Sequence, residues 1–308
     1  MSLKANLITL SNGHKIPALG LGTWQGTDDP GAVEKAVKLA IDFGYRHFDC
    51  ASVYGNENEI GKAIKQKIEE GVVKREDIYI VTKLWNDEHD PKAVIPACKR
   101  SLKKLGLNYL DLYLVHWPFS YPDEVDFVET WRAMEECVKL GLTHSIGVSN
   151  FNIEQLTRLL DSASIKPVMN QIEAHINLNQ KELRDFCHSK GIAVTAYSPF
   201  GAPGRDSVFQ PPGPEVNLDS PVIAEIAKKY KKSNSQVALR YLIDVGTIPI
   251  PKSSSKKHLE SNIDVFDFKL TEEEISAIEK LERGFRTCPA TQFNNLKEYP
   301  FQEPRKKK

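Results

Sequence analysis

The 308-residue sequence predicts an α/β protein built as one (β/α)8 TIM barrel, with an N-terminal β-hairpin cap and two extra helices. Two observations lead to this prediction. The chain is long enough for one large core, and 41% of its residues are hydrophobic. Short β-rich runs also alternate with helical runs along most of its length, as in a parallel sheet covered by helices. We therefore expect residues 1–308 to form a single domain.

The first residues are predicted to form the hairpin. Two apolar runs, 7–10 and 15–19, flank the tetrapeptide Ser11-Asn12-Gly13-His14. Asn-Gly between two apolar runs is the strongest short-range hairpin signal, because both residues tolerate the left-handed backbone of a tight turn. Two strands this short do not form a domain alone, so we expect them to cap one end of the barrel.

The barrel is predicted from eight β-rich runs, most of them followed by a helical run. The expected strands lie near Leu19 and at residues 47–49, 78–83, 111–116, 145–149, 168–171, 193–197 and 247–250. The expected helices lie at 31–43, 57–69, 91–105, 125–140, 153–161, 180–189 and 221–230, and the helical runs 235–243 and 271–281 exceed the simple repeat. Segment 200–217 is too long for a simple connection, so we expect it to cover the rim of the barrel.

Composition excludes several classes of protein. The 41 basic and 41 acidic residues balance, whereas nucleic-acid binding requires a basic face, so we expect a small-molecule partner. The five cysteines are odd in number and contain no Cys-x-x-Cys pair, which indicates neither a disulfide framework nor a metal site. The sequence shows no apolar run typical of a signal peptide or a membrane span. We therefore expect a cytoplasmic protein without a membrane partner.

Four ionisable residues are expected at one rim of the barrel. Asp49, Lys83 and His116 lie at the ends of predicted strands, and Tyr54 follows the first of these strands closely. In a parallel barrel the active site lies where the strands end. A tyrosine is a poor acid near neutral pH, but a neighbouring ammonium group would lower its pKa. We expect Lys83 to supply that charge, Asp49 to orient Lys83, and His116 to orient a substrate carbonyl oxygen.

Proton transfer alone does not complete a reaction at such a site. The sequence contains no Gly-x-Ser-x-Gly motif, and the nearby thiol of Cys50 is better explained by packing. A hydride would have to come from a cofactor. The dinucleotide fingerprint Gly-x-Gly-x-x-Gly is absent, because Gly20 and Gly22 are followed by Gln25 where glycine is required. These patterns alone leave a barrel enzyme of unassigned activity.

The chain resembles the aldo-keto reductase family over nearly its whole length. The motifs that carry the resemblance are GLGTW (20–24), GYRHFDCASVYGNE (44–57), KLW (83–85), HWP (116–118), GVSNF (147–151), NQ (170–171), AYSP (196–199) and IPKS (250–253). Each motif is moderately specific alone, but all of them occur in the family's order. The resemblance implies NADPH-dependent reduction of aldehydes or ketones by a monomer, with Asp49, Tyr54, Lys83 and His116 as the catalytic tetrad.

The resemblance also implies a set of cofactor contacts. Tyr197 matches the residue that stacks on the nicotinamide, and Ser198 and Gly201 match a loop over the pyrophosphate. Lys252 and Ser253 match the clamp on the 2′-phosphate, since a lysine beside short hydroxyls suits a dianion. The remaining matches are Thr23, Trp24 and Asp49 near the reactive end, Ser149, Asn150 and Gln171 at the carboxamide, and Ser254, Ser255, His258 and Asn262 near the adenosine.

Two departures from the family pattern concern the cofactor. His258 stands where many NADPH-using members carry arginine, and histidine is largely neutral at pH 7. Lys252 still favours NADPH, but selectivity over NADH is expected to be weaker. The residues that latch the phosphate-covering loop in aldose reductase fall on Gly204 and Gln25, so we expect a weaker latch and faster cofactor release.

The implied substrate pocket is apolar, which suits bulky carbonyl compounds. The loop between Trp117 and Trp131 is shorter than in aldose reductase, so we expect the pocket to be more open on that side. The expected lining residues are Trp24, Val53, Tyr54, Trp85, His116, Trp117, Phe119, Phe285 and Cys288.

Three alternatives stay open. The chain also resembles insect reductases that act on 3-dehydroecdysteroids, and a steroid would fit an open apolar pocket. A non-catalytic NADPH-binding or structural protein is the second alternative, although a scaffold has no need of four ionisable groups held together. The third is a barrel hydrolase, which would need paired carboxylates at the rim, and only Asp49 is expected there.

Overall fold

The computed structural model describes residues 6–24, 29–203 and 213–301 of the chain. Gln25 and Gly204, the two expected latch positions, lie outside these residues, as does the middle of segment 200–217. Within the described ranges, no helix has the length and apolar character needed to cross a membrane.

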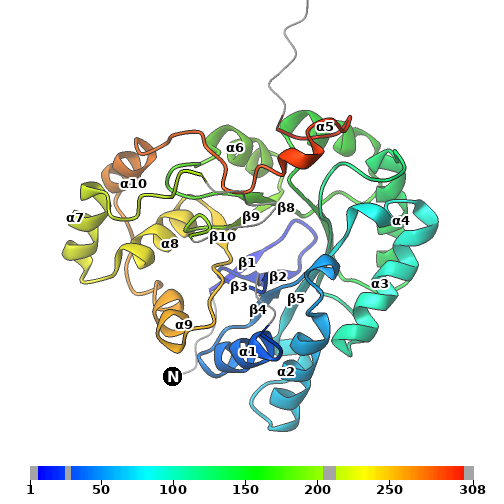
Figure 1. Cartoon of the computed structure of the whole chain (residues 1–308), viewed down its shortest axis with the longest axis horizontal. Helices are drawn as coiled ribbons and strands as arrows, with labels where there is room; N and C mark the ends of the chain where they lie inside the picture. The colour runs from blue at the N-terminus through cyan, green and yellow to red at the C-terminus, as the bar shows by residue number, and fades with distance from the viewer. Residues whose placement is uncertain (1–5, 25–28, 204–212, 302–308) are drawn as a thin grey trace, which may run out of the picture.

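Eight parallel strands form the barrel in the order in which they occur along the chain. Backbone hydrogen bonds from Gly20 to Pro249 (3.0 Å) and from Gly22 to Pro251 (3.2 Å) join its first and last strands. Figure 1 shows the helices arranged around these strands. The predicted (β/α)8 barrel is thus confirmed. Its strands are β3 (Leu21–Gly22), β4 (His47–Asp49), β5 (Tyr79–Leu84), β6 (Leu112–Val115), β7 (Ile146–Ser149), β8 (Met169–Glu173), β9 (Ala193–Tyr197) and β10 (Thr247–Pro249).

All the helices that the sequence predicts are present, with bounds that differ by at most two residues. They are α1 (Ala32–Asp42), α2 (Glu57–Glu69), α3 (Pro91–Leu105), α4 (Phe127–Lys139), α5 (Ile153–Ser162), α6 (Lys181–Ser189), α7 (Pro221–Tyr230), α8 (Asn234–Asp244) and α10 (Glu272–Glu279). The prediction missed α9 (Lys256–Ile263), in which only Leu259 and Asn262 are buried. So little apolar surface leaves no helical period to detect.

The structure also shows which helices are additional to the barrel. Helix α8 packs against β10, and α9 contacts both α8 and α1, so these two helices complete the ring. Helices α7 and α10 pack against each other and against α8, and Figure 1 shows them at the outer edge of the molecule. The extra helices are therefore α7 and α10, whereas the sequence placed segment 235–243, now α8, outside the repeat.

Short polar side chains start many of these helices. The side chain of the residue before the helix accepts a hydrogen bond from a backbone N–H of the first turn, which would otherwise lack a partner. Such caps let a helix begin soon after a strand ends. They are Asp90 before α3, Asp126 before α4, Asn152 before α5, Ser220 before α7, Ser233 before α8 and Thr271 before α10.

The predicted hairpin closes the N-terminal end of the barrel. Strands β1 (Leu7–Thr9) and β2 (Lys15–Pro17) pair antiparallel, and Asn12 in their turn donates a hydrogen bond to Ser145, just before β7. Ile16 is fully buried in one cluster with barrel residues such as Val81, Leu114 and Met169. The opposite end, where the strands finish, is left to the loops that carry the candidate site.

Candidate active site

Four ionisable side chains meet where three neighbouring strands end. Asp49 is the last residue of β4, Lys83 lies near the end of β5 and His116 follows β6 directly, while Tyr54 ends the short 3-10 helix η1 (Ser52–Tyr54) after β4. Lys83 Nζ lies 2.5 Å from Asp49 Oδ1 and 3.5 Å from Tyr54 Oη. The ring centroids of Tyr54 and His116 are 5.9 Å apart. The structure therefore brings together all four residues that the strand ends predicted.

The ion pair between Asp49 and Lys83 is buried and fully hydrogen-bonded. Lys83 is 0% exposed and Asp49 2% exposed. Lys83 Nζ also donates to the Cys50 carbonyl oxygen at 2.7 Å, and Asp49 Oδ2 accepts from Gln171 Nε2 at 2.7 Å. Without such partners, burial of two charges would cost more than their attraction returns. The pair thus holds an ammonium group in a fixed position beside the Tyr54 hydroxyl.

The Tyr54 hydroxyl is protonated in this environment. Burial raises its pKa well above the ordinary value, and the negative charge of Asp49 raises it further. Burial therefore outweighs the lowering of this pKa that the sequence led us to expect from Lys83. The Lys83 ammonium group, held by Asp49 at 2.5 Å, lies 3.5 Å from Tyr54 Oη, where it can stabilise a phenolate once the proton has left. Tyr54 is therefore a neutral O–H donor at the rim.

His116 is a neutral ring next to this donor. Burial lowers its pKa well below the ordinary value of 6.5, and the positive charge of Lys83 lowers it further. The edge of the ring meets Trp85 at a centroid distance of 5.0 Å. The His116 carbonyl oxygen accepts a hydrogen bond from Asn150 Nδ2 at 3.1 Å, which ties the end of β6 to that of β7. A neutral imidazole can donate one hydrogen bond to a substrate oxygen without adding a charge.

Polar side chains at the ends of β7, β8 and β9 form a connected network. Ser149 Oγ donates to the Gln171 carbonyl oxygen at 2.9 Å, and Asn150 Nδ2 donates to Ser149 Oγ at 3.2 Å. Tyr197 Oη donates to Asn150 Oδ1 at 2.8 Å. The four side chains that the resemblance assigns to the nicotinamide end thus lie together, in contact with the tetrad through Gln171.

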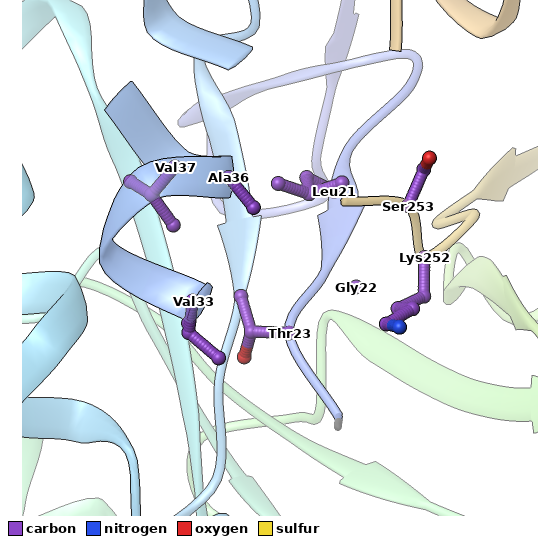
Figure 2. Close-up of a pocket in the computed structure, with 8 residues that line it drawn as sticks. All are labelled: Leu21, Gly22, Thr23, Val33, Ala36, Val37, Lys252 and Ser253. Atoms are coloured by element: carbon purple, nitrogen blue, oxygen red, sulfur yellow. The ribbon is translucent and has the colours of Figure 1, made fainter. Parts of the chain in front are cut away.

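The residues expected to clamp the 2′-phosphate lie in the segment after β10. Lys252 forms a parallel bridge with Gly22 of β3, and Figure 2 shows Lys252 and Ser253 beside Gly22 and Thr23. Thr23 is buried and its Oγ1 donates to the Asp49 carbonyl oxygen at 2.8 Å. Lys252, Ser254, Ser255 and His258 are exposed, whereas Ser253 and Asn262 are buried. An exposed lysine beside hydroxyls and the start of α9 is a donor set that suits a phosphate.

The expected loop over the pyrophosphate starts in an unusual backbone conformation. Ser198 and Gly201 have φ values of 49° and 69°, and the Ser198 carbonyl oxygen accepts a hydrogen bond from Gly201 N at 2.8 Å. A Cβ at Gly201 would lie 2.8 Å from Val216 and 3.3 Å from Thr287. The segment that leaves β9 therefore lies directly against the C-terminal segment.

Aromatic side chains surround the tetrad. Trp24 lies 5.1 Å from Tyr54 between ring centroids, and Val53 is half-buried on η1. Trp117 and Phe119 form a buried cluster with Cys288, Ala290 and Tyr299. Phe285 does not join this cluster; its ring lies 5.7 Å from His175. The sequence interpretation missed Phe293 and Phe301, which pack against the cluster from the end of the chain.

The C-terminal segment covers the side that the short loop was expected to leave open. Phe293 stacks on Tyr121 of that loop at 5.1 Å and contacts Phe119 at 4.8 Å. Tyr121 Oη accepts a hydrogen bond from Trp85 Nε1 at 2.8 Å. Loop length alone could not reveal this cover, because the covering residues lie far along the chain.

The fold and this site define a class of protein: a barrel enzyme whose tyrosine can donate a proton to a substrate oxygen. Polar groups suited to a phosphate-bearing cofactor lie at the same end of the barrel. Residues 18–283 match the aldo/keto reductase family. The chain is 46% identical to the aldo-keto reductase AKR2E4 of Bombyx mori over 97% of this chain and 100% of that protein. It is 42% identical to human aldo-keto reductase family 1 member C2 over 98% and 99% of the two chains. The chain belongs to the aldo/keto reductase family.

Solved structures agree with this assignment. The crystal structure of Bombyx mori AKR2E4 in complex with NADP superposes with a TM-score of 0.90 at 45% identity, over 96% of this chain and 99% of that one. The aldose reductase of Schistosoma japonicum also gives a TM-score of 0.90, at 41% identity, over 97% and 99% of the chains.

Proposed function

We propose that this protein reduces aldehydes and ketones to alcohols with NADPH, and that Tyr54 donates the proton. The observation that carries the proposal is the position of the Tyr54 hydroxyl, 3.5 Å from the Lys83 ammonium and beside the neutral ring of His116. The family membership and the NADP complex of the Bombyx relative support it.

The residues of this chain fit the proposed cofactor. NADPH differs from NADH by one dianionic phosphate, which requires a cation and hydrogen-bond donors. Lys252 is exposed and has no carboxylate within ion-pair distance among the described residues. Ser253 to Ser255 follow it, and the exposed Lys256 and Lys257, which the sequence interpretation missed, open α9. Lys252 therefore favours NADPH, and His258 in place of arginine makes the preference moderate.

The chain's own groups divide the chemistry between them. NADPH supplies the hydride when bound. The Tyr54 hydroxyl, which stays protonated because its pKa is raised, donates a hydrogen bond and then its proton to the carbonyl oxygen. The Lys83 ammonium stabilises the phenolate that remains, and Asp49 holds this ammonium in place. His116 orients the same oxygen as a neutral ring.

We further propose that the substrates are bulky and apolar. Trp24 lies against Tyr54 and Trp85 against His116, and Trp85 packs on the apolar cluster of Trp117 and Phe119. Apolar surroundings of this kind gain free energy from covering a large apolar substrate. A ketosteroid of the 3-dehydroecdysteroid type belongs to this class and is the specific substrate that we propose testing first. We also propose that the protein acts as a cytoplasmic monomer.

The test is NADPH oxidation with an aromatic aldehyde, a sugar aldehyde and a ketosteroid, each repeated with NADH. We expect turnover that is fastest with NADPH and an apolar carbonyl. Tyr54→Phe removes only the hydroxyl, so we expect kcat to fall by at least about a thousandfold while NADPH still quenches tryptophan fluorescence with an unchanged Kd. Near-normal turnover in Tyr54→Phe would refute the role of Tyr54. Binding of NADPH without turnover in the natural protein would instead favour a non-catalytic binding protein.

A further inference from the structure

The carboxylate of Glu173 is buried at the end of β8 and has no part in the chemistry described above. Glu173 is 0% exposed. Its Oε1 accepts hydrogen bonds from Thr287 N at 2.5 Å, Thr287 Oγ1 at 2.8 Å and His175 Nε2 at 3.1 Å, and its Oε2 accepts from Cys288 N at 3.0 Å. A single side chain thus accepts four hydrogen bonds, three of them from two adjacent residues of the C-terminal segment.

The partners of His175 define its tautomer. Asn177 N donates to His175 Nδ1 at 3.2 Å, so this nitrogen carries no proton. The proton that His175 donates to Glu173 is therefore on Nε2. Burial by itself would raise the pKa of Glu173, but the hydrogen bonds from His175, Thr287 and Cys288 outweigh burial and hold the pKa below its ordinary value. Glu173 is therefore a carboxylate that only accepts hydrogen bonds.

The residues held by Glu173 lie against the apolar cluster that we propose as a wall of the substrate pocket. Cys288 packs in one cluster with Trp117 and Phe119, and Tyr197 packs against the same cluster. Thr287 packs closely against Gly201, since a Cβ added at Gly201 would lie 3.3 Å from the Thr287 side chain. Downstream of these two residues, the segment continues through Phe293, which covers the short loop by stacking on Tyr121. The position of this wall therefore depends on how the chain is fixed at residues 287 and 288.

Other contacts hold the same segment less directly. Asn177 Nδ2 donates to the Leu281 carbonyl oxygen at 2.6 Å, and Arg158 forms an ion pair with Glu298 at 2.9 Å, with Arg158 42% exposed. The first contact precedes the wall. The second follows it, as do the hydrogen bonds from Gln155 Nε2 to the Glu298 carbonyl oxygen at 2.9 Å and from Asn152 Nδ2 to the Pro300 carbonyl oxygen at 3.1 Å. Hydrogen bonds to a buried charge are stronger than either kind of contact. Glu173 is thus the main attachment of residues 287 and 288, while Arg286 Nη2, just before them, donates to Gln180 Oε1 at 3.3 Å.

We propose that Glu173 is a positioning residue for carbonyl selectivity: its carboxylate fixes Thr287 and Cys288, and so sets the wall against which a bulky apolar substrate packs. The inference rests on the proposed reductase function for its kinetic consequence, but not for its structural one. It predicts that loss of the carboxylate weakens binding of large carbonyl substrates more than that of short ones and leaves the tetrad in place.

Glu173→Gln tests the inference with the smallest change in shape. One oxygen becomes an NH2 donor, which must face either the Thr287 donors or Cys288 N, so at least one backbone N–H loses its acceptor. We expect the KM of a ketosteroid to rise about tenfold, the KM of propanal to rise much less, and the kcat of both to change little. Glu135→Gln on α4 is the control for replacing a buried carboxylate, and it should change neither KM. Glu135 accepts from Ser164 N and Ile165 N through one oxygen, Oε1, which glutamine retains.

Thiol labelling gives a readout that does not depend on activity. Cys50, Cys98, Cys137 and Cys187 are 0% exposed and Cys288 is 9% exposed. Burial, together with the charge of Glu173, raises the pKa of Cys288 to about 12, so its thiol reacts slowly. In Glu173→Gln we expect iodoacetamide to label Cys288 at least about tenfold faster, as measured by mass spectrometry of each cysteine, while the other four keep their rates. Glu173→Asp keeps the negative charge but withdraws the carboxylate from Thr287 and Cys288, so we expect faster labelling of Cys288 in this variant as well.

The outcomes separate the two proposals. Faster labelling of Cys288 alone in both Glu173→Gln and Glu173→Asp, with a KM effect that grows with substrate size, supports the inference. Faster labelling in Glu173→Gln only would overturn it, because the lost charge explains that result. Equal labelling rates in Glu173→Gln and the natural protein would overturn it, as would equal KM changes for propanal and the ketosteroid. Faster labelling of all five cysteines would also overturn it, since that result indicates general destabilisation. If the natural protein reduces no carbonyl, the proposed function fails, and the labelling of Cys288 still decides whether Glu173 positions the segment.

Discussion

At the scale of single residues, the site depends on charges and polar groups whose partners are supplied locally. Lys83 is one of the largest fully buried side chains, yet Asp49, the Cys50 carbonyl and Tyr54 surround its ammonium group. The charge is therefore usable for chemistry, because no solvent competes for it. The buried charge of Glu173 is likewise supplied with partners, because its carboxylate accepts four hydrogen bonds. A sequence does not reveal such a residue, since a glutamate at a strand end is most often a surface acid.

His47 gives a prediction at this scale. Burial lowers its pKa from 6.5 to about 4. Between these values the unfolded chain binds a proton on His47 and the folded protein does not, so the free energy of unfolding falls as the pH drops from 6.5 towards 4. The shift corresponds to about 3 kcal/mol. In His47→Gln we expect the free energy of unfolding to decline less between pH 6.5 and 4, as measured by urea unfolding at several pH values. Parallel declines in both proteins would contradict a neutral buried His47.

At the scale of elements, caps and periodicity explain most of the helices. The N-caps Asp90, Asn152 and Thr271 are visible in the sequence, and the helices they start were predicted with nearly correct bounds. Helix α9 was missed because it buries only Leu259 and Asn262. It forms because it fills the gap between α8 and α1, and tertiary contact replaces the missing apolar face.

Gly61 provides a prediction for the contact between α2 and α3. Alanine favours a helix over glycine by roughly 0.5–1 kcal/mol. However, a Cβ at Gly61 would lie 2.5 Å from the Leu105 carbonyl oxygen, so one helix has to move. We expect Gly61→Ala to lower the free energy of unfolding by about 1–3 kcal/mol, measured with urea. The control is Lys65→Ala on the exposed side of α2, which should change it little. Equal stability of the two variants would show that the helices do not approach this closely.

At the scale of the whole molecule, the two ends of the barrel have separate tasks. The hairpin and the cluster around Ile16 close the N-terminal end, and the tetrad lies at the opposite end where the strands finish. In barrels of this kind, residues at the first end contribute to stability and those at the second to catalysis. A change at one end should therefore leave the other nearly unaffected.

Ile16→Ala tests this separation. Ile16 is 0% exposed, and its truncation leaves a cavity among barrel residues. We expect the free energy of unfolding to fall by about 2–4 kcal/mol, with the Kd of NADPH and the KM of the carbonyl unchanged within about twofold. Thermal unfolding and steady-state kinetics provide the two measurements. A large change in KM at a temperature where the variant is still folded would show that the hairpin end is coupled to the site.

The barrel, the order of its strands and the four residues of the tetrad could all be predicted from the sequence. These features depend on local patterns: apolar period, capping residues, and ionisable residues at strand ends that a parallel sheet must bring to one rim. Only the tertiary structure decided the raised pKa of Tyr54, the helix α9, the covering of the short loop by Phe293 and the anchoring of Cys288 by Glu173. Each of these depends on burial or on contact between residues far apart in the chain, and neither leaves a periodic signal in the sequence.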